Sequence, residues 1–383
     1  MQRLRVLFLI DHLIDTGGAE RFAIGLATHL PSDRFELWVC STRVAEPSAV
    51  AMLREAGVRH VHLGRRRKSD VYRLLGLVAL LRRERFDILH AHMFGSNLWG
   101  SLIGRACGVP VIVAHEQTWS YQGDPIRRWL DGRVIGRLAT RFVAVSTQDA
   151  SRMVSIERVP PEKVVMLPNA YVPRAGSPDT DPRGELGLDA GTPLLASIAV
   201  LRPQKALSVL LDAFASVLES IPDVHLLLAG DGECRDVLEQ QARRLAINHR
   251  VHFLGRRKDV DAILRAADLA VMSSDFEGTP LVAYECIANR TPLVATAVGG
   301  LLDIIDDGRT GRLVPPRDPS ALAGAIVELL SDPARREQMA SAAAENSEQF
   351  TIGAAARRFA SLYEALVQES WRREDGDVRL QSA

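Results

Sequence analysis

The sequence predicts an α/β protein built from two doubly wound domains with parallel sheets. The chain has 383 residues, enough for two domains at roughly 150 residues each. Apolar, β-branched runs alternate with amphipathic helical segments twice over, and a stretch without periodicity separates the two series. This order favours parallel strands, because the crossover helices then bury both faces of each sheet. A composition of 47% hydrophobic and 25% charged residues excludes disordered, collagen-like and disulfide-scaffold classes.

The first series predicts a Rossmann-like N-terminal domain over residues 1–170. Its expected helices cover residues 19–30, 70–84 and 97–108. Its expected strands are the apolar runs at residues 3–10, 35–40, 58–63, 86–92, 110–116, 141–146 and 163–168.

A Pro-, Gly- and Asp-rich stretch follows, and residues 171–192 are the predicted linker. The second series predicts a Rossmann-like C-terminal domain over residues 193–349. A further helix is expected at 350–370, packed back on the N-terminal domain. Residues 371–383 have the composition of a polar, frayed tail. The expected strands of the second series are 193–200, 224–230, 251–255, 267–273, 291–297 and 311–316, with helices between them.

Cysteine usage and hydropathy indicate the compartment. The four cysteines lie far apart without a Cys-x-x-Cys pair, which argues against a zinc site and a disulfide framework. No apolar run reaches the 18 or so residues that a membrane-spanning helix needs, and the first residues turn acidic too early for a signal peptide. We therefore expect a cytoplasmic protein.

Charge is distributed unevenly although the formal net charge is zero. Residues 1–170 hold 24 Lys and Arg against 16 Asp and Glu, whereas residues 171–383 hold 23 against 31. The cluster at residues 65–68, followed by Arg82, Arg83 and Arg85, suggests an anionic partner such as a membrane surface. Solvated helix faces explain the same pattern without any partner.

Candidate site residues follow the predicted strands, because doubly wound folds bind ligands at the carboxyl ends of their strands. Gly17 and Gly18 precede a helix and would let an anion approach its free N–H groups, although the Gly-x-Gly-x-x-Gly dinucleotide pattern is absent. His90 and His92 share one face of a strand end, and His115 ends the next strand. Apart from these histidines nothing supports a zinc site, so no metal is predicted.

The second domain carries charged candidates. Arg202 and Lys205 follow a strand and open a helix, where two cations suit a phosphate or diphosphate. Glu277 and Glu285 lie eight residues apart, with Thr279 expected to cap the next helix and Pro280 to start it. Their carboxylates could accept hydrogen bonds from sugar hydroxyls, while free helix N–H groups bind phosphate.

These motifs together resemble a known family. The spacing of Glu277 and Glu285 matches the Glu-x7-Glu motif of retaining GT-B glycosyltransferases. The Gly-Gly-Ala-Glu-Arg loop at 17–21, the His-Ala-His strand end, Arg-Pro-Gln-Lys at 202–205 and Ala-Gly-Asp-Gly-Glu at 229–233 are similar to family GT4. The resemblance runs over about residues 3–365, with the motifs in the expected order.

The resemblance implies an activity and a role for each motif. The chain would be a hexosyltransferase that moves a sugar from a nucleoside-diphosphate sugar to an acceptor hydroxyl, in glycan, glycolipid or exopolysaccharide biosynthesis. The N-terminal domain would bind the acceptor and the C-terminal domain the donor. In the N-terminal domain, Gly17 and Gly18 would contact the donor phosphates, and His92 would contact the donor sugar and the acceptor. In the C-terminal domain, Arg202 and Lys205 would bind the diphosphate, Glu277 the donor sugar, Glu285 the ribose, and a loop that includes Arg256 the nucleobase. Other residues that would contact the donor are Gly278, Thr279, Pro280 and Leu281.

The chain departs from the family pattern at three positions. It has Ala170 and Ala206 where the family usually has glycine, and Asp303 where the family usually has glutamate. Either alanine would be unfavourable in a loop that needs a positive φ. None of the three changes removes a proposed reacting group.

Several functional questions stay open at this stage. The resemblance implies a UDP-sugar or a GDP-sugar donor without a metal or other cofactor, a saccharide or lipid-linked acceptor, and no nucleic acid. Two alternatives keep the fold but change the function: a sugar-nucleotide epimerase that acts on the donor alone, and a non-catalytic subunit that binds a nucleotide sugar.

Overall fold

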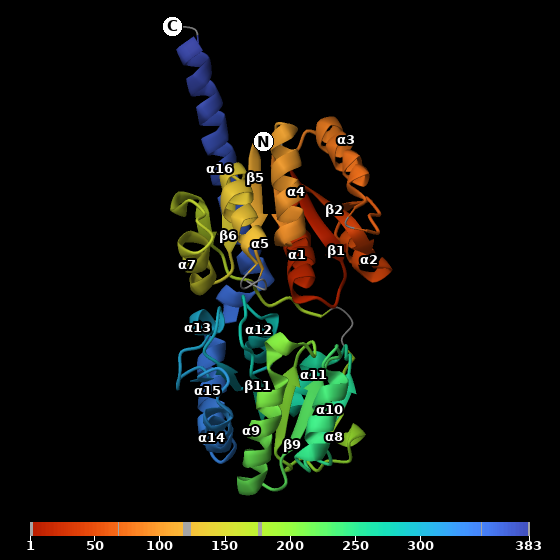
Figure 1. Ribbon diagram of the computed structural model, residues 1–383, viewed down its shortest axis with the longest axis vertical. Coiled ribbons are helices and arrows are strands. Elements are labelled where there is room, and N and C mark those ends of the chain that lie inside the picture. Colours follow the sequence, from red (N-terminus) through yellow and green to blue (C-terminus); the bar gives the residue numbers. More distant parts are fainter. Residues whose placement is uncertain (1–2, 68, 118–123, 175–177, 346, 382–383) are drawn as a thin grey trace. The chain divides into compact units, whose positions relative to one another are not determined.

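The computed structural model describes residues 3–67, 69–117, 124–174, 178–345 and 347–381, with side chains of the last helix described up to residue 372. The chain divides into two compact units (Figure 1). The N-terminal unit comprises Met1–Val172 with Thr351–Ala383, and the C-terminal unit comprises Pro173–Phe350.

The N-terminal unit is built on a parallel seven-stranded sheet in the order β3-β2-β1-β4-β5-β6-β7. Its strands are β1 (Leu4–Leu13), β2 (Phe35–Ala45), β3 (Arg59–His62), β4 (Ile88–His92), β5 (Val111–His115), β6 (Arg141–Ala144) and β7 (Val164–Met166). Strands β4 and β5 are buried along their whole length, as expected for a sheet with both faces covered.

Helices cover both faces of this sheet. One core joins β1 and β2 to α1, α2 and α16, and the other joins the opposite faces of the strands to α3 and neighbouring segments. The helices are α1 (Gly18–His29), α2 (Pro47–Glu55), α3 (Leu75–Glu84), α4 (Met93–Ala106), α5 (Pro125–Leu130), α6 (Gly136–Leu138), α7 (Thr147–Ser155) and α16 (Ile352–Gln381), with short turns η1 (Val71–Leu74), η2 (Asp131–Ile135) and η3 (Pro161–Lys163).

The C-terminal unit repeats this plan on a parallel six-stranded sheet in the order β10-β9-β8-β11-β12-β13. Its strands are β8 (Leu194–Ile198), β9 (His225–Ala229), β10 (Val251–Gly255), β11 (Leu269–Met272), β12 (Leu293–Thr296) and β13 (Arg312–Val314). Its helices are α8 (Pro182–Glu185), α9 (Leu207–Ser220), α10 (Arg235–Arg244), α11 (Val260–Ala266), α12 (Leu281–Ala288), α13 (Leu301–Ile304), α14 (Pro319–Leu330) and α15 (Pro333–Glu345), with turns η4 (Pro203–Lys205) and η5 (Ser347–Phe350). The predicted α/β class with two doubly wound parallel sheets is thus confirmed.

Each sheet has a switch point where its strand order reverses. It lies between β1 and β4 in the N-terminal unit and between β8 and β11 in the C-terminal unit. The chain leaves the two central strands of such a sheet in opposite directions, so a crevice opens at their carboxyl ends. The loops after β1, β4, β8 and β11 are therefore the places to look for a site.

Two predicted segments differ in the structure. From Pro173 the predicted linker belongs to the C-terminal unit, where Arg183 pairs with Asp268 at 2.9 Å and donates to the Ala266 carbonyl oxygen at 2.9 Å. Helix α16 continues to Gln381, through the segment expected to be a polar tail. That segment contains three arginines, which favour helix, and has no proline to end it.

Candidate functional site

His92 ends β4 at the switch point of the N-terminal unit. Its side chain is fully buried, and it is followed by Met93, whose φ is +69°. A left-handed conformation is costly for a bulky residue, and active sites are one place where such strained residues cluster. The turn from β4 into α4 is therefore a strained one, directly after the predicted histidine.

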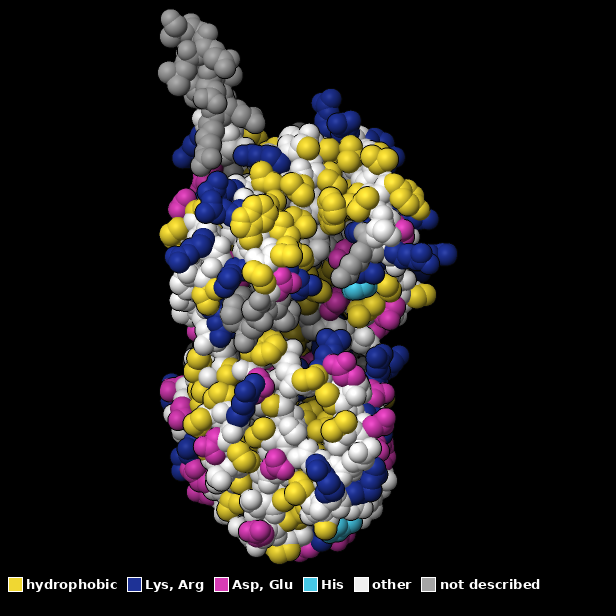
Figure 2. Space-filling model, in the orientation of Figure 1, with side chains coloured by type: hydrophobic (Ala, Val, Ile, Leu, Met, Phe, Trp, Pro, Cys, Tyr) yellow, Lys and Arg dark blue, Asp and Glu magenta, His cyan; other side chains and the backbone are white. Residues whose placement is uncertain are grey.

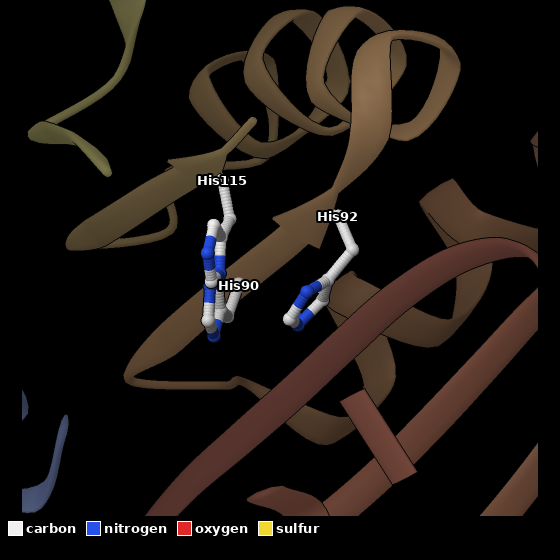
Figure 3. A group of neighbouring side chains, drawn as sticks. All are labelled: His90, His92 and His115. Carbon is white, nitrogen blue, oxygen red and sulfur yellow. The ribbon is translucent and has the colours of Figure 1, made fainter. Parts of the chain in front are cut away.

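A buried hydrogen-bonded chain lies beside His92. Gln117 Nε2 lies 3.2 Å from His115 Nε2, His115 Nδ1 lies 3.2 Å from His90 Nε2, and His90 Nδ1 lies 2.6 Å from the Tyr363 hydroxyl. Figure 3 shows the three imidazoles side by side below the ends of β4 and β5. Each bond can be made by a neutral imidazole that donates with one nitrogen and accepts with the other. Burial also drives the pKa of His90 and that of His115 well below the usual value for histidine.

His92 takes no part in this series of hydrogen bonds. Neither of its ring nitrogens bonds to any part of the chain that the structure describes, and burial lowers its pKa to about 3. One ligand nitrogen from each of His90, His92 and His115 lies within 4.8 Å of the others, close enough for one metal ion to join them. Both ring nitrogens of His90 and of His115 already have hydrogen-bond partners, so a metal ion would have to replace some of these bonds.

The helix N-termini at this switch point hold carboxylates of the chain itself. A methyl group placed on Gly17 would lie 2.0 Å from Glu20 Oε2, so the Glu20 carboxylate lies against the first residues of α1. In the same way a methyl group on Gly95 would lie 2.4 Å from Asp11 Oδ2, at the start of α4. A phosphate approaching Gly17 and Gly18 would have to displace a like charge first.

Two of the charged candidates, Lys205 and Glu277, meet at the switch point of the C-terminal unit. Lys205 Nζ lies 2.5 Å from Glu277 Oε1, and the Ser274 hydroxyl donates to the same oxygen at 2.6 Å. Lys205 comes from the turn after β8 and Glu277 from the loop after β11, the two strands beside the reversal. The sequence spacing gives no sign of this partner, and the structure pairs Lys205 with the buried Glu277.

Two further expectations about helix starts are corrected here. Residues 203–205 form η4, and α9 begins only at Leu207, after Ala206 in the left-handed conformation. Arg202 is exposed just before η4. Helix α12 begins at Leu281 with Pro280 at the N-cap position, so Thr279 is not the cap. Proline at that position lacks a capping side chain, which leaves the first N–H groups of α12 for other acceptors.

The loop after β11 is held by its neighbours. The Thr296 hydroxyl donates to the Ser274 carbonyl oxygen at 2.6 Å, and Gln204 Nε2 donates to the Phe276 carbonyl oxygen at 2.9 Å. Gly300 N donates to the Gly278 carbonyl oxygen at 2.6 Å. A methyl group on Gly299, whose φ is +53°, would lie 1.9 Å from the Glu277 carbonyl oxygen. Glycine is therefore required where the β12 loop supports the backbone of Glu277.

Glu285 lies in the second turn of α12 and is buried. Its Oε1 lies 2.9 Å from a guanidinium nitrogen of Arg174, a residue inside the predicted linker. Arg256 is exposed after β10, and the backbone there is tied to the next loop because Gly230 N donates to the Gly255 carbonyl oxygen at 2.7 Å. A methyl group on Gly230 would lie 1.8 Å from the Ala199 carbonyl oxygen, so that turn is structural.

The structure thus brings some predicted residues together and leaves others apart. Lys205, Glu277 and the start of α12 share one corner of the C-terminal unit, and His92 lies at the corresponding corner of the N-terminal unit. Sequence reasoning missed four polar partners: Ser274, Arg174, Glu20 and Tyr363. Glu20 stands within the quoted motif at 17–21 and Ser274 only three residues before Glu277, so both could have been found. The contacts of Arg174 and Tyr363 join segments far apart in the sequence.

The fold and this arrangement agree with what comparison with known proteins shows. Residues 16–173 match the family described as Glycosyltransferase Family 4, and residues 179–346 match the family described as Glycosyl transferases group 1. The D-inositol 3-phosphate glycosyltransferase of Thermobispora bispora is 30% identical, with 91% of this chain and 90% of that protein covered. The alpha-D-kanosaminyltransferase of Streptomyces kanamyceticus is also 30% identical, with 74% and 78% covered.

Solved structures give the same fold. Anabaena HepE in complex with UDP-glucose superimposes with a TM-score of 0.80 at 22% identity, over 95% of this chain and 100% of that one. The chain therefore belongs to the GT-B glycosyltransferases of family 4, and it is a glycosyltransferase.

Proposed function

We propose that this glycosyltransferase moves a sugar from a nucleoside-diphosphate sugar to an acceptor hydroxyl, with retention of configuration at the anomeric carbon. The observation that carries the proposal is the Lys205–Glu277 pair at the β8/β11 switch point, 2.5 Å apart and beside the start of α12. The names of the relatives support the donor class, because HepE is described in complex with UDP-glucose. Glu277 and Glu285 match the motif of retaining enzymes.

The charges at this corner suit departure of a diphosphate. Negative charge builds on the leaving phosphate as the glycosidic bond breaks, and fixed cations or N–H groups stabilise it in the transition state. Lys205 and the exposed Arg202 would supply the cations, and the first N–H groups of α12 would supply donors. Both observed bonds of Glu277 go to Oε1, so Oε2 is the oxygen we assign to a hydroxyl of the donor sugar.

His92 would orient the sugar and the acceptor. A histidine with a pKa of about 3 is a weak base at neutral pH, and a good general base has its pKa near the working pH. We therefore propose that the leaving phosphate accepts the acceptor's proton. The neutral imidazole would hold hydroxyl groups with its two ring nitrogens.

We assign a UDP-sugar as the donor, with a GDP-sugar as the second choice, and propose that the reaction uses no metal ion. Because Lys205, Arg202 and the α12 N–H groups supply positive charge, the reaction needs no divalent cation. We expect activity to persist in excess EDTA. Gly17 and Gly18 keep a secondary role near the donor phosphates, reached only if Glu20 moves aside.

The acceptor is a saccharide, either free or linked to a lipid, and we propose a role in glycan, glycolipid or exopolysaccharide biosynthesis. The described residues contain no helix long and apolar enough to cross a bilayer. We propose a cytoplasmic enzyme whose basic N-terminal half contacts the anionic inner face of the membrane. Scattered cysteines without disulfide spacing are typical of a reducing compartment and support that location.

The donor can be identified by thermal shift with UDP-, GDP- and ADP-sugars. A ligand at 100 times its Kd adds about 2.7 kcal/mol to the free energy of unfolding, so the true donor should raise the Tm clearly. NMR of the product formed with the best donor then reports the anomeric configuration. An inverted product would contradict the retaining assignment, and no response to any nucleotide sugar would contradict the donor class.

The same assay separates the two alternatives. Incubation of the donor without an acceptor yields epimerised donor or a glycal only if the chain is an epimerase. A donor that raises the Tm but is never consumed with a panel of acceptors would favour a binding subunit. Against that second alternative, the C-terminal unit retains Arg202, Lys205, Glu277 and Glu285 together.

A further inference from the structure

We infer that the N-terminal unit docks on an anionic lipid bilayer through one particular face, formed by η1 and α3, α4, and α5 with η2 and α6. The inference rests on the proposed membrane contact and names the surface that makes it. We call this surface the α3–α5 face. It replaces the arginine cluster at residues 65–68, which the sequence suggested.

The arginine cluster is poorly placed for such a contact. Arg65 is only 5% exposed, so its guanidinium cannot reach a lipid headgroup. The backbone N–H groups of Arg66 and Arg67 both donate to Asp70 Oδ2 at 2.9 Å, which ties this segment into a turn. Lys68 lies outside the described residues.

The α3–α5 face exposes large apolar side chains that a solvated surface does not need. Ile126 is 70% exposed, Leu75 69%, Tyr72 62% and Trp129 59%. Val71 and Leu102 add to the same surface. Figure 2 shows hydrophobic side chains gathered over α4, α5 and their surroundings, with Lys and Arg at the margins. A large exposed apolar patch with a polar rim marks an interaction site.

These elements pack together, so their side chains share one surface. Helix α3 contacts α4, α4 contacts η2, and η2 contacts α5 and α6. The elements hold eight basic residues against two acidic ones, Glu84 and the buried Asp131. Seven of the eight are exposed, and Arg127 is half-buried. The basic residues are Arg73, Arg82, Arg83, Arg105, Arg127, Arg128, Arg133 and Arg137.

The combination selects a bilayer as the occupant. Anionic lipids attract basic residues near their surface, and Trp, Tyr, Ile and Leu between those residues can enter the boundary between headgroups and acyl chains. Tryptophan and tyrosine favour that boundary because one end of each ring is apolar and the other polar. Helix α10 of the C-terminal unit differs, because its three basic residues, Arg235, Arg243 and Arg244, are offset by Asp236 and Glu239.

Vesicle co-sedimentation of the full chain tests the inference. We expect binding to mixed phosphatidylglycerol and phosphatidylcholine vesicles at low salt, and none to phosphatidylcholine alone. Ile126→Ser and Trp129→Ser should each lower the vesicle affinity by about tenfold or more. The matched control is Val237→Ser on α10, which is 64% exposed in the C-terminal unit and should leave binding unchanged.

A second pair of variants tests the charges. Arg82→Gln with Arg83→Gln should weaken binding to anionic vesicles and reduce its dependence on salt, because fewer charges remain to be screened. The control, Arg243→Gln with Arg244→Gln, removes two exposed arginines from α10 and should change neither. Brominated lipid should quench the fluorescence of Trp129, and Trp129→Phe should remove that quenching while preserving most of the affinity.

Three results would overturn the inference: no sedimentation with anionic vesicles, sedimentation that the variants of the α3–α5 face leave unchanged, or a dimer in solution that Ile126→Ser dissociates. The last result would assign the face to a second copy of the chain. Thermal shift with the sugar-nucleotide panel keeps the two proposals distinguishable. Vesicle binding without any donor response would leave the docking face standing while the donor proposal fails, and a donor response without vesicle binding would do the reverse.

Discussion

The two switch points of this protein have the same topology but opposite chemistry. At the β1/β4 point the helix N-termini are covered by Glu20 and Asp11, and the strand end holds the uncharged His92. At the β8/β11 point a lysine and two buried glutamates gather around the start of α12. Carboxylates thus lie against the helix N-termini in the N-terminal unit, whereas the N-terminus of α12 in the C-terminal unit lies near cations.

The proposed function uses this difference to divide donor and acceptor binding between the units. An incoming diphosphate meets carboxylates in the N-terminal unit, where it would be repelled, and Lys205 and Arg202 in the C-terminal unit, where it is attracted. A neutral imidazole, which can donate with one nitrogen and accept with the other, suits sugar hydroxyls instead. The fold therefore supplies two similar crevices, and a few side chains decide which one can take the charged donor.

We expect the largest effect from Lys205→Ala, which removes the lysine of the β8/β11 switch point. We expect kcat/KM to fall by about 10² to 10³, because a fixed charge opposite the leaving phosphate is lost. Stability should fall as well, since the buried Glu277 carboxylate loses its cation. Initial rates and urea unfolding measure the two effects.

The double variant Lys205→Ala with Glu277→Gln separates them. It removes the uncompensated buried charge, so it should recover stability without recovering rate. Recovery of the wild-type rate would show that Lys205 serves only to neutralise Glu277, and the diphosphate assignment would then be wrong.

The two glutamates offer the next largest effect. Glu285→Gln should raise the donor Kd by an amount worth roughly 1.5 to 3 kcal/mol, because a charged acceptor of ribose hydroxyls becomes neutral. Glu277→Gln should also lower kcat, since its proposed contact is with the transferred sugar. Calorimetry and initial rates on both variants test this division, and identical profiles would refute it. Arg174→Gln is the control: an equal rise in Kd would mean that Glu285 acts by holding Arg174.

How far the sequence predicts this site depends on the range of each interaction. The α/β class, the order of the motifs and the placement of His92, Lys205 and Glu277 at strand ends follow from local periodicity and short motifs. The partner of Lys205 does not, because the Lys205–Glu277 pair joins residues 72 positions apart. Thr279 and Pro280 show the same limit locally, since their order suggested a cap but the backbone begins the helix one residue later.

The long-range contacts explain the remaining differences. Arg174 falls in a Pro- and Gly-rich stretch that looks like a linker, yet it pairs with Glu285, 111 residues away. Tyr363 reaches His90 from the last helix, 273 residues along the chain. Neither partner can be read from spacing, because the sheet order that brings them together is set by the whole fold.

The pH dependence of stability offers a smaller effect. The pKa of His92 is about 3 in the folded protein, below the ordinary value of 6.5 that it regains on unfolding. The unfolded state therefore binds one more proton between pH 6.5 and 3, and stability falls as the pH falls through that window. His92→Gln should flatten the slope by about 1.4 kcal/mol per pH unit in that range. Urea unfolding between pH 4 and 8 measures it, and the slopes above pH 7 serve as the control. Equal slopes below pH 6 would contradict the burial argument.

The two alanines that replace the family's usual glycines give the finest test, one in each unit. Ala206 has φ +45° and ψ +39°, a left-handed conformation that costs an alanine about 1 to 2 kcal/mol. Ala206→Gly should relieve that strain, although glycine also raises the conformational entropy of the unfolded chain. We expect a net rise in the free energy of unfolding of up to about 1 kcal/mol. Ala170 is fully buried without a positive φ. Ala170→Gly should therefore cost about 1 to 2 kcal/mol through the lost methyl contact and the greater entropy of the unfolded state. Urea unfolding of both variants should show shifts of opposite sign, and equal shifts would mean that backbone conformation does not distinguish the two positions.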